Sequence, residues 1–267
     1  MVEISLVKYG TIPSSMLDKI SGLMEESYSI LGEPMGGSVD LEVFEKSEEE
    51  TFFAMHDAFR GKPRIRIYLD KLQELPEPVG LAGIRRQIAH SILHGSLKFY
   101  LVKFPQDLIR AINQFNLPYE FGNSLLYSIG MAAKEYGVTE LLTRKGFVKD
   151  QVAYAEYILE PTAEELLAWE IALRNKLEKI LHLAAIIRDI SCAVPLIDNE
   201  MFGNKIKAGI KGKLAHLNPD YQASIQRIIE KFPLLGTDMF VNIELITKWF
   251  TEEILTYEFC SFPPGSS

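Results

Sequence analysis

The sequence predicts an α+β fold, with a small sheet between two helices in the first part of the chain and an α-helical bundle after it. Three patterns predict this fold: helical periodicity over residues 14–32 and 81–97, strand-like alternation between them, and long apolar helical stretches after residue 161. The chain has 267 residues, of which 47% are hydrophobic, so it is long enough to form two lobes.

Residues 14–32 predict an amphipathic helix, because apolar side chains recur there at helical spacing. These side chains are Met16, Leu17, Ile20, Leu23, Met24 and Tyr28. Ser14 or Ser15 is suited to cap the first turn, since a serine hydroxyl accepts a hydrogen bond from a free backbone N–H at that position.

Three segments between residues 39 and 69 predict strands. Residues 39–44 alternate apolar with acidic side chains, residues 51–59 are β-prone, and residues 64–69 alternate sharply between Arg and apolar side chains. The predicted order is therefore helix, two or three strands, then a second helix.

Residues 81–97 predict that second helix, entered from the turn around Pro76 and Pro78, and most of its surface is apolar. Its apolar side chains are Ile84, Ile88, Ala89, Ile92, Leu93 and Leu97. A narrow polar arc remains, formed by Gln87, His90, Ser91 and His94. The helix is expected to be largely buried, with two histidines sharing this arc.

His90 and His94 are four residues apart, so on a helix they lie on one face, where two imidazoles are able to bind one metal ion. The chain has only five histidines, and two of them form this pair. The alternative interpretation is structural, with both rings hydrogen-bonded to buried backbone or to acidic neighbours. The spacing thus makes His90 and His94 the candidate metal ligands.

The segment His90-Ser91-Ile92-Leu93-His94 resembles the H-E-x-x-H signature of the zincin superfamily of zinc peptidases. The predicted order of elements over residues 14–97 is also similar to the minimal zincin core, in which a small sheet backs the metal-binding helix and an edge strand guides a peptide substrate. The resemblance implies zinc as the cofactor and a peptide or protein partner. It also implies a glutamate as general base, and here Ser91 occupies that position.

A serine has no pKa near neutrality, so it does not accept the proton of a zinc-bound water as a carboxylate does. Loss of a general base typically lowers the rate by about 10²- to 10⁴-fold. The chain is therefore predicted to be a degenerate zincin, and its catalytic residues are unknown. If only the base is missing, Ser91→Glu is expected to raise any trace peptidase activity.

The third protein ligand of a zincin is not given by a motif here. The branch that adds a glycine and a third histidine is excluded, because Leu97 and Tyr100 occupy those positions. The other branch takes a glutamate from a later helix, and Glu135 in the predicted helix 123–142 is the first candidate, although Gly137 weakens that helix. The alternatives left open are Glu140, Glu156 and Glu160.

Two residues of the predicted strand 51–59 are further candidates. His56 is a possible third metal ligand or substrate contact, although a single strand histidine is more often structural. Asp57 is a possible displaced general base, which would make a fully active peptidase the third interpretation of the chain.

Composition excludes several other classes. The net charge of −8 argues against broad nucleic-acid binding, and the basic segment with Lys205, Lys207, Lys211 and Lys213 is expected to be a solvated connection between helices. No P-loop, G-x-G-x-x-G or G-x-S-x-G motif occurs. No signal segment or membrane-spanning run is found, so a cytoplasmic location is expected, with Cys192 and Cys260 as reduced thiols.

The second half of the chain predicts a bundle of about four helices. Residues 161–165 are typical of a helix start, an apolar face follows through residue 187, and further helices are predicted over residues 219–231 and 238–257. Trp169, Trp249 and His182 are expected in its core. The predicted domains are a zincin-like lobe over 1–110, connecting helices over 111–160, the bundle over 161–262 and a disordered tail over 263–267.

These patterns favour a metal-binding, zincin-like protein in which peptidase activity is weak or lost. The chief alternative is a non-enzymatic interaction or regulatory protein that keeps the same scaffold without metal. The oligomeric state and the substrate do not follow from the sequence.

Overall fold

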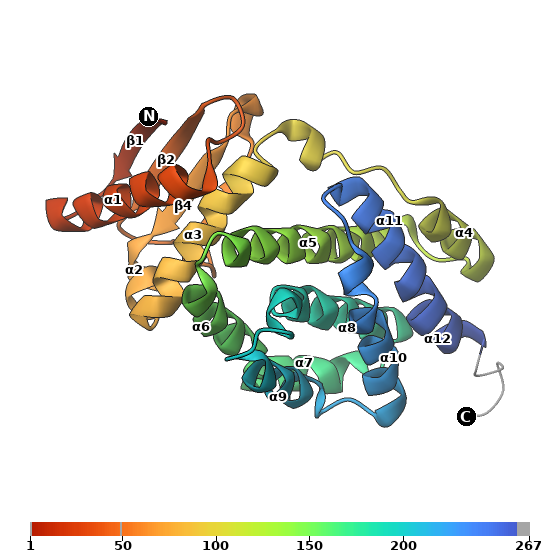
Figure 1. Cartoon of the computed structure of the whole chain (residues 1–267). Helices are drawn as coiled ribbons and strands as arrows, with labels where there is room; N and C mark the ends of the chain where they lie inside the picture. Colours follow the sequence, from red (N-terminus) through yellow and green to blue (C-terminus); the bar gives the residue numbers. More distant parts are fainter. Residues whose placement is uncertain (1, 49, 261–267) are drawn as a thin grey trace. The chain divides into compact units, whose positions relative to one another are not determined.

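The computed structural model describes residues 2–48 and 50–260, and it is an α+β protein (Figure 1). Contacts divide the chain into two compact units, one made of residues 1–102 and 138–157 and the other of residues 103–137 and 158–267. This division differs from the predicted domains, because residues 138–157 belong with the sheet rather than with a separate connecting segment. The predicted tail, 263–267, lies outside the described residues.

The first unit contains a four-stranded sheet in the order β1-β2-β4-β3. The strands are β1 (Glu3–Tyr9), β2 (Ser38–Phe44), β3 (Ala54–Asp57) and β4 (Arg64–Tyr68). Strands β1, β2 and β4 are parallel, whereas β3 is antiparallel to β4. The register sets Leu41 beside Ile65 and Val43 beside Ile67, so the apolar side chains of neighbouring strands share one face.

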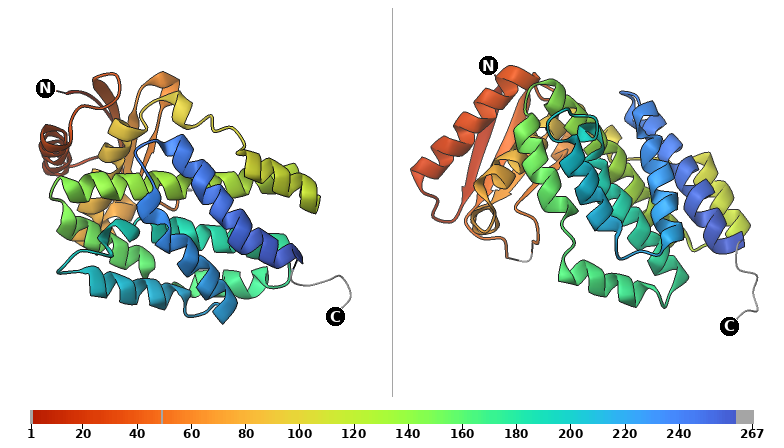
Figure 2. Two further views of the ribbon diagram at one scale, coloured as in Figure 1. Left: turned by 45° about the vertical axis from the view of Figure 1, so that its right-hand side comes forward. Right: turned by 60° about the horizontal axis from the view of Figure 1, so that its bottom comes forward.

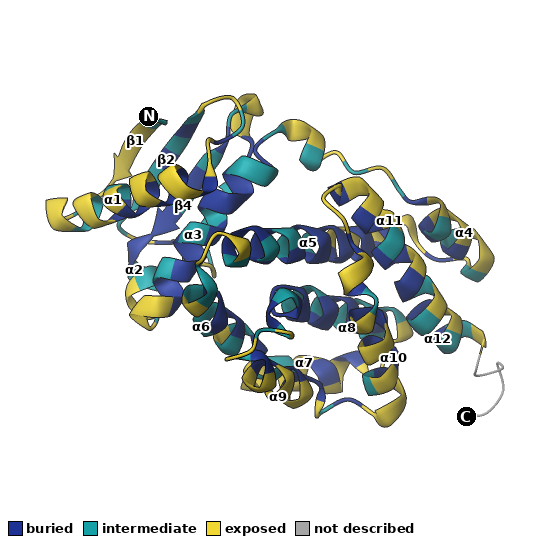
Figure 3. Cartoon of the chain, in the orientation of Figure 1, coloured by how far each residue is buried: buried dark blue, intermediate teal, exposed yellow. Residues whose placement is uncertain are grey.

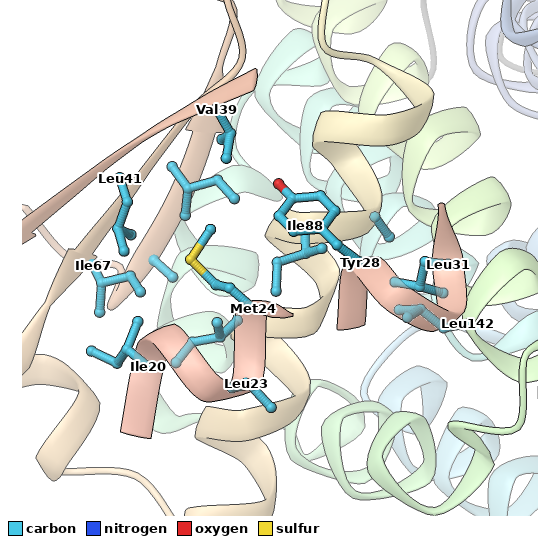
Figure 4. Close-up of a cluster of buried hydrophobic side chains, with 14 of the residues drawn as sticks. Ile20, Leu23, Met24, Tyr28, Leu31, Val39, Leu41, Ile67, Ile88 and Leu142 are labelled. Carbon is cyan, nitrogen blue, oxygen red and sulfur yellow. The ribbon is translucent and has the colours of Figure 1, made fainter. Parts of the chain in front are cut away.

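That apolar face packs against α1 (Ser14–Leu31) and α3 (Glu77–Leu93), and Figure 2 shows α1 lying along the sheet. The core between them is drawn in Figure 4, where Ile20 and Met24 of α1, Leu41 and Ile67 of the sheet, and Ile88 of α3 lie together. The short helix α2 (Leu69–Gln73) joins β4 to α3. Alternation in the strands and a 3.6-residue period in the helices thus bury one face of each element.

The opposite face of the sheet is polar. Arg64 and Arg66 of β4 form ion pairs with Glu42 of β2 and Asp57 of β3, at 2.6–3.5 Å. These side chains are only partly buried. This face of the sheet therefore has a network of ion pairs, whereas the opposite face packs into the apolar core.

The second unit is helical, and two helices supply residues to both units: α5 (Tyr119–Arg144) and α6 (Val148–Leu159). The remaining helices are α4 (Gln106–Phe115), α7 (Ala163–Ala172), α8 (Lys176–Ser191), α9 (Gly203–Leu214), α10 (Pro219–Glu230), α11 (Met239–Phe250) and α12 (Thr256–Cys260). Short 3-10 turns or a π turn occur at Phe59–Gly61, Leu97–Phe99, Val194–Leu196, Phe232–Leu234 and Thr251–Leu255. Buried and exposed positions alternate along these helices in Figure 3.

Side chains cap the first turns of several of these helices. Thr162 and Glu165 form a capping box at α7, since each side chain bonds the backbone N–H of the other. Asn175, Asn218 and Asp238 cap α8, α10 and α11 through their side-chain oxygens.

Local predictions were confirmed to different degrees. The first helix and the strands at 39–44 and 64–69 are present, and the strand expected at 51–59 is shorter, at Ala54–Asp57. Strand β1 was not predicted. The serine cap of α1 was wrong, because Pro13 precedes the helix and no side chain caps it. No helix in the described residues is long and apolar enough to cross a membrane.

Candidate histidine site

His90 and His94 meet at the C-terminal end of α3. The helix ends at Leu93, so His94 is its C-cap and the predicted continuation to Leu97 was wrong. The His94 N–H still donates to the His90 carbonyl oxygen (2.6 Å), and the two Nδ1 atoms lie 3.1 Å apart. Both side chains are buried. The predicted pair is therefore brought together, with both Nδ1 atoms pointing toward one another.

Gly95 shapes the turn that holds His94. A Cβ atom at this position would lie 2.3 Å from the Ser91 carbonyl oxygen and 2.7 Å from Pro63 Cγ. Because one of these neighbours is backbone of the same helix end, only glycine fits here without a shift of the turn.

His56 joins the pair from strand β3. Its ring is nearly parallel to that of His90, with an interplanar angle of 11° and centroids 6.0 Å apart. Its Nδ1 atom lies 2.8 Å from the Tyr100 hydroxyl oxygen, and Phe99 contacts the His94 ring edge-on at 5.5 Å. Three histidines and two aromatic side chains thus form one cluster, which we call the histidine site: His56, His90, His94, Phe99 and Tyr100.

Burial raises the pKa of the Tyr100 hydroxyl, and the nearby Asp57 carboxylate raises it further. Tyr100 therefore stays a neutral phenol at physiological pH and is able to hydrogen-bond His56 without carrying charge. Sequence reasoning placed Tyr100 only as an excluded ligand position, and its spacing from His94 gave no signal of this role.

The Ser91 side chain makes its hydrogen bonds with residues outside the histidine site. It is fully buried against α1, where its Oγ atom lies 2.8 Å from the Tyr28 hydroxyl oxygen and donates to the Ile88 carbonyl oxygen at 2.6 Å. The residue in the general-base position is thus part of the contact between α1 and α3.

Arg86 lies one turn before His90 on the same face of α3, and the sequence did not indicate that it is buried. Its guanidinium donates to Thr139 Oγ1 and Gln151 Oε1, both at 2.7 Å, and lies 4.6 Å from the centroid of the Tyr154 ring. These partners come from α5 and α6 within the first unit. Arg86 therefore fixes the helix that carries the histidines to its neighbours.

The predicted third ligands are distributed over both units. Glu135 is partly buried in the portion of α5 that belongs to the second unit. Burial lowers the pKa of the neighbouring Lys134 to about 8, although the negative charge of Glu135 raises that pKa. Glu140 lies 3.9 Å from Arg144 in an exposed ion pair. Glu156 lies in α6, and Glu160 directly after it.

Asp57 is also tied to other groups. Its carboxylate accepts hydrogen bonds from the Arg64 guanidinium at 2.6 and 3.1 Å and from the Phe59 N–H at 3.0 Å. Its role in the ionic face of the sheet disfavours Asp57 as a displaced general base.

The fit to a zincin metal centre is partial. Among the described residues, no group of three or more His, Cys, Asp or Glu side chains is arranged to hold a metal ion. Two imidazoles are close enough to share one ion, and a third ligand is not assembled with them.

A second histidine cluster lies in the helical unit. The rings of His182 and His216 pack around Trp169, with centroids 5.3 and 5.9 Å from that of the indole. Lys213, predicted to lie in a solvated loop, is instead buried in α9, where its ammonium bonds Glu165 (2.5 Å) and the Ile158 carbonyl oxygen (3.0 Å). The prediction of a solvated basic loop is thus wrong for Lys213.

Comparison of the chain with models of protein families, with curated proteins and with solved structures finds no significant match.

Proposed function

We propose that this protein is a zincin-like metal-binding protein in which His90 and His94 bind zinc and peptide hydrolysis is weak or lost. One observation carries the proposal: the Nδ1 atoms of the two rings are 3.1 Å apart in a buried position. Two nitrogens bound to one tetrahedral zinc ion are separated by about 3.3 Å, given Zn–N bonds of about 2.0–2.1 Å. The separation of the two nitrogens is therefore close to this value, and the rings must turn so that both lone pairs are directed at one ion.

The surroundings support a site for peptide rather than a buried structural metal. Strand β3 is an edge of the described sheet, paired only with β4, and it presents His56 beside His90. An extended peptide is able to pair with an edge strand as a further strand of the sheet. We therefore place the peptide or protein partner along β3.

The same geometry argues against efficient hydrolysis. Ser91 has no carboxylate, and its hydroxyl is held in the contact between α1 and α3. The Asp57 carboxylate is bound by Arg64 on the ionic face of the sheet. Neither residue therefore supplies a general base to the histidine site. When bound, zinc would supply positive charge for ligand carbonyl groups, while the protein's residues bind and orient the peptide. Activity is expected to be lower than that of a peptidase with a glutamate base by about 10²- to 10⁴-fold.

The alternative function, a metal-free interaction protein, is favoured by the same 3.1 Å contact taken as an N–H···N hydrogen bond between the two rings. In that form one Nδ1 atom carries a hydrogen and donates a hydrogen bond, which the unprotonated Nδ1 atom of the other ring accepts. The contact then stabilises the end of α3, and the two buried histidines have no role in metal binding.

Zinc binding separates these two functions. We would measure zinc content and affinity of tag-free protein by elemental analysis and calorimetry, for the wild type, for His90→Ala/His94→Ala, and for a matched control that removes the other pair of neighbouring histidines, His182→Gln/His216→Gln. We expect one zinc ion per chain, lost in the first variant and kept in the control. Equal zinc content in all three, or none in the wild type after incubation with zinc, would overturn the proposal.

A single variant tests the third ligand. His56→Ala replaces the candidate whose ring lies beside that of His90, and it is expected to lower zinc affinity by about tenfold or more. Glu140→Gln serves as a control, since its carboxylate is exposed beside Arg144.

A further inference from the structure

A pocket lies between the N-terminal parts of α1 and α3, and residues of α2 also line it. Its volume is about 180 Å³, and it is partly open to solvent. Most of the side chains that line it are apolar: Met16, Ile20, Leu23, Leu72, Leu75, Leu81 and Ile84. The remaining lining residues are Lys19, Gln73, Glu77 and Gly80. All of these residues belong to the first unit, so the pocket forms within one compact body.

The floor of the pocket is part of the core of the first unit. Ile20 and Leu23 of α1 (Figure 4) and Ile84 of α3 are buried in that core. Met16 and Leu72 pack against the same core but are only partly buried. A molecule that fills the pocket removes apolar surface of this kind from water, which is favourable. Because the floor is a packed core, the pocket is largely formed before a ligand binds.

Gly80 determines how closely α2 and α3 approach each other beside the pocket. A Cβ atom at this position would lie 2.8 Å from Leu72 Cδ1, so a larger side chain would displace Leu72. Gly80 precedes His90 by ten residues on the same helix, which corresponds to about 15 Å along its axis. The pocket is therefore separate from the histidine site.

The two charged residues of the lining neutralise each other. Lys19 Nζ lies 2.5 Å from Glu77 Oε1, and this ion pair joins the start of α3 to α1. Both side chains are exposed, so the pair lies where the pocket meets solvent. Neither charge is left to attract an ionic ligand, and transfer of an ion onto the apolar floor would be costly. The exposed Gln73 adds an amide that is able to hydrogen-bond a hydroxyl group.

The volume limits the size of the ligand. An apolar cavity of about 150 Å³ in another protein holds one benzene molecule, whereas pockets for drug-sized ligands have about 300–1,000 Å³. A pocket of about 180 Å³ is therefore suited to a single small ring or a short branched chain. It is too small for the side of a partner helix or for a long lipid chain.

We propose that this pocket binds one small, uncharged, mainly apolar molecule about the size of benzene or benzyl alcohol. The apolar part of the ligand lies on Ile20, Leu23 and Ile84. A single hydroxyl group is accommodated at the open side, beside Gln73. The site goes beyond the proposed zinc function, because none of its lining residues belongs to the histidine site.

Three probes with the same ring and different charges test the class of ligand. Ligand-observed NMR titrations would use benzyl alcohol, benzoate and benzylamine. Benzyl alcohol is expected to bind saturably with a Kd in roughly the millimolar range, and the two ions are expected to bind at least about tenfold more weakly. The proposal is rejected if benzyl alcohol does not saturate, or if either ion binds as tightly.

Filling the pocket tests its location. Met16→Trp and Leu81→Trp each place a large ring in the pocket, one from α1 and one from α3, and each is expected to weaken benzyl alcohol binding by about tenfold or more. Ser15→Trp is the matched control, since Ser15 is exposed and does not line the pocket. Binding that survives in both filling variants, or that is lost in the control, would place the ligand elsewhere. Circular dichroism of each variant checks that the fold is kept.

Removal of the ion pair tests whether charge contributes. Lys19→Met/Glu77→Gln is expected to keep the affinity for benzyl alcohol within about twofold, because an exposed pair contributes little and the ligand carries no charge. A loss of tenfold or more in this variant, with the fold retained, would mean that the charges rather than the apolar floor bind the ligand.

Discussion

The hydroxyl oxygens of Tyr28 and Ser91 lie 2.8 Å apart in the buried contact between α1 and α3. Ser91 donates its own proton to the Ile88 carbonyl oxygen, so the Tyr28 O–H is the donor to Ser91 Oγ. Burial raises the pKa of Tyr28, which keeps this proton in place. Ser91, which occupies the position of the general base in the proposed zincin-like segment, therefore has a structural role.

Ser91→Glu is expected to destabilise the protein rather than to restore a peptidase. The variant would place a larger, ionisable side chain in a fully buried position against Tyr28, at a cost of about 3 kcal/mol or more. Urea denaturation measures the loss, and a peptide-cleavage assay under folding conditions is expected to show no gain. A variant that is as stable as the wild type and cleaves peptides would contradict this role of Ser91.

Tyr28→Phe and Ser91→Ala provide the matched controls. Each leaves one hydroxyl of the pair without its partner and is expected to lower the free energy of unfolding by about 1–2 kcal/mol. The double variant removes both groups, so its loss is expected to be smaller than the sum of the two. Additive losses would mean that the two hydroxyls do not interact.

The parts of the fold that sequence could predict are those governed by local periodicity. Helix α1, strands β2 and β4, and the buried isoleucines Ile84 and Ile88 of α3 all follow from it. Strand β1 was missed because it is an edge strand whose side chains are mostly exposed, so it has no clear pattern of buried positions. The end of α3 was placed too late, because apolar Leu97 extends the helical pattern past the turn at Gly95.

The histidine site was predictable only in part. The spacing of His90 and His94 predicted their proximity, since it depends on one turn of helix. Partners from distant segments had no local signal: Arg86 bonds residues 53 and 65 positions away. His56 was named as a candidate, yet its position beside His90 depends on the pairing of β3 with β4, which residue spacing does not reveal.

Gly95→Ala is expected to disturb the histidine site. The added Cβ would lie 2.3 Å from the Ser91 carbonyl oxygen, so the turn must shift, at a cost of about 1–3 kcal/mol. Gly137→Ala is the control, because a Cβ there meets nothing within 4 Å and α5 continues as helix through this position. This control is expected to gain about 0.5–1 kcal/mol from helix propensity. Thermal or urea denaturation measures both, and equal effects would contradict the close packing at Gly95.

The stability of the helical unit is expected to fall as the pH drops below about 6.5. Desolvation lowers the pKa of His182, and the charges of His216 and Lys213 lower it further. The negative charge of Glu165 raises this pKa and only partly offsets them. Desolvation also lowers the pKa of His216. The unfolded chain therefore binds protons near the ordinary histidine pKa of 6.5, where the folded unit does not, and protonation favours unfolding. Above this pH both states are neutral and the effect disappears.

Trp fluorescence during urea denaturation between roughly pH 5 and pH 8 measures this dependence, because both tryptophans, Trp169 and Trp249, lie in the helical unit. The expected loss is of the order of 1 kcal/mol, since solvent screens these half-buried rings. His182→Gln/His216→Gln is expected to flatten the profile. The depressed pKa of Glu165 adds a separate loss only below its ordinary value of 4.5, outside this range. A double variant that keeps the wild-type slope would show that other groups carry it.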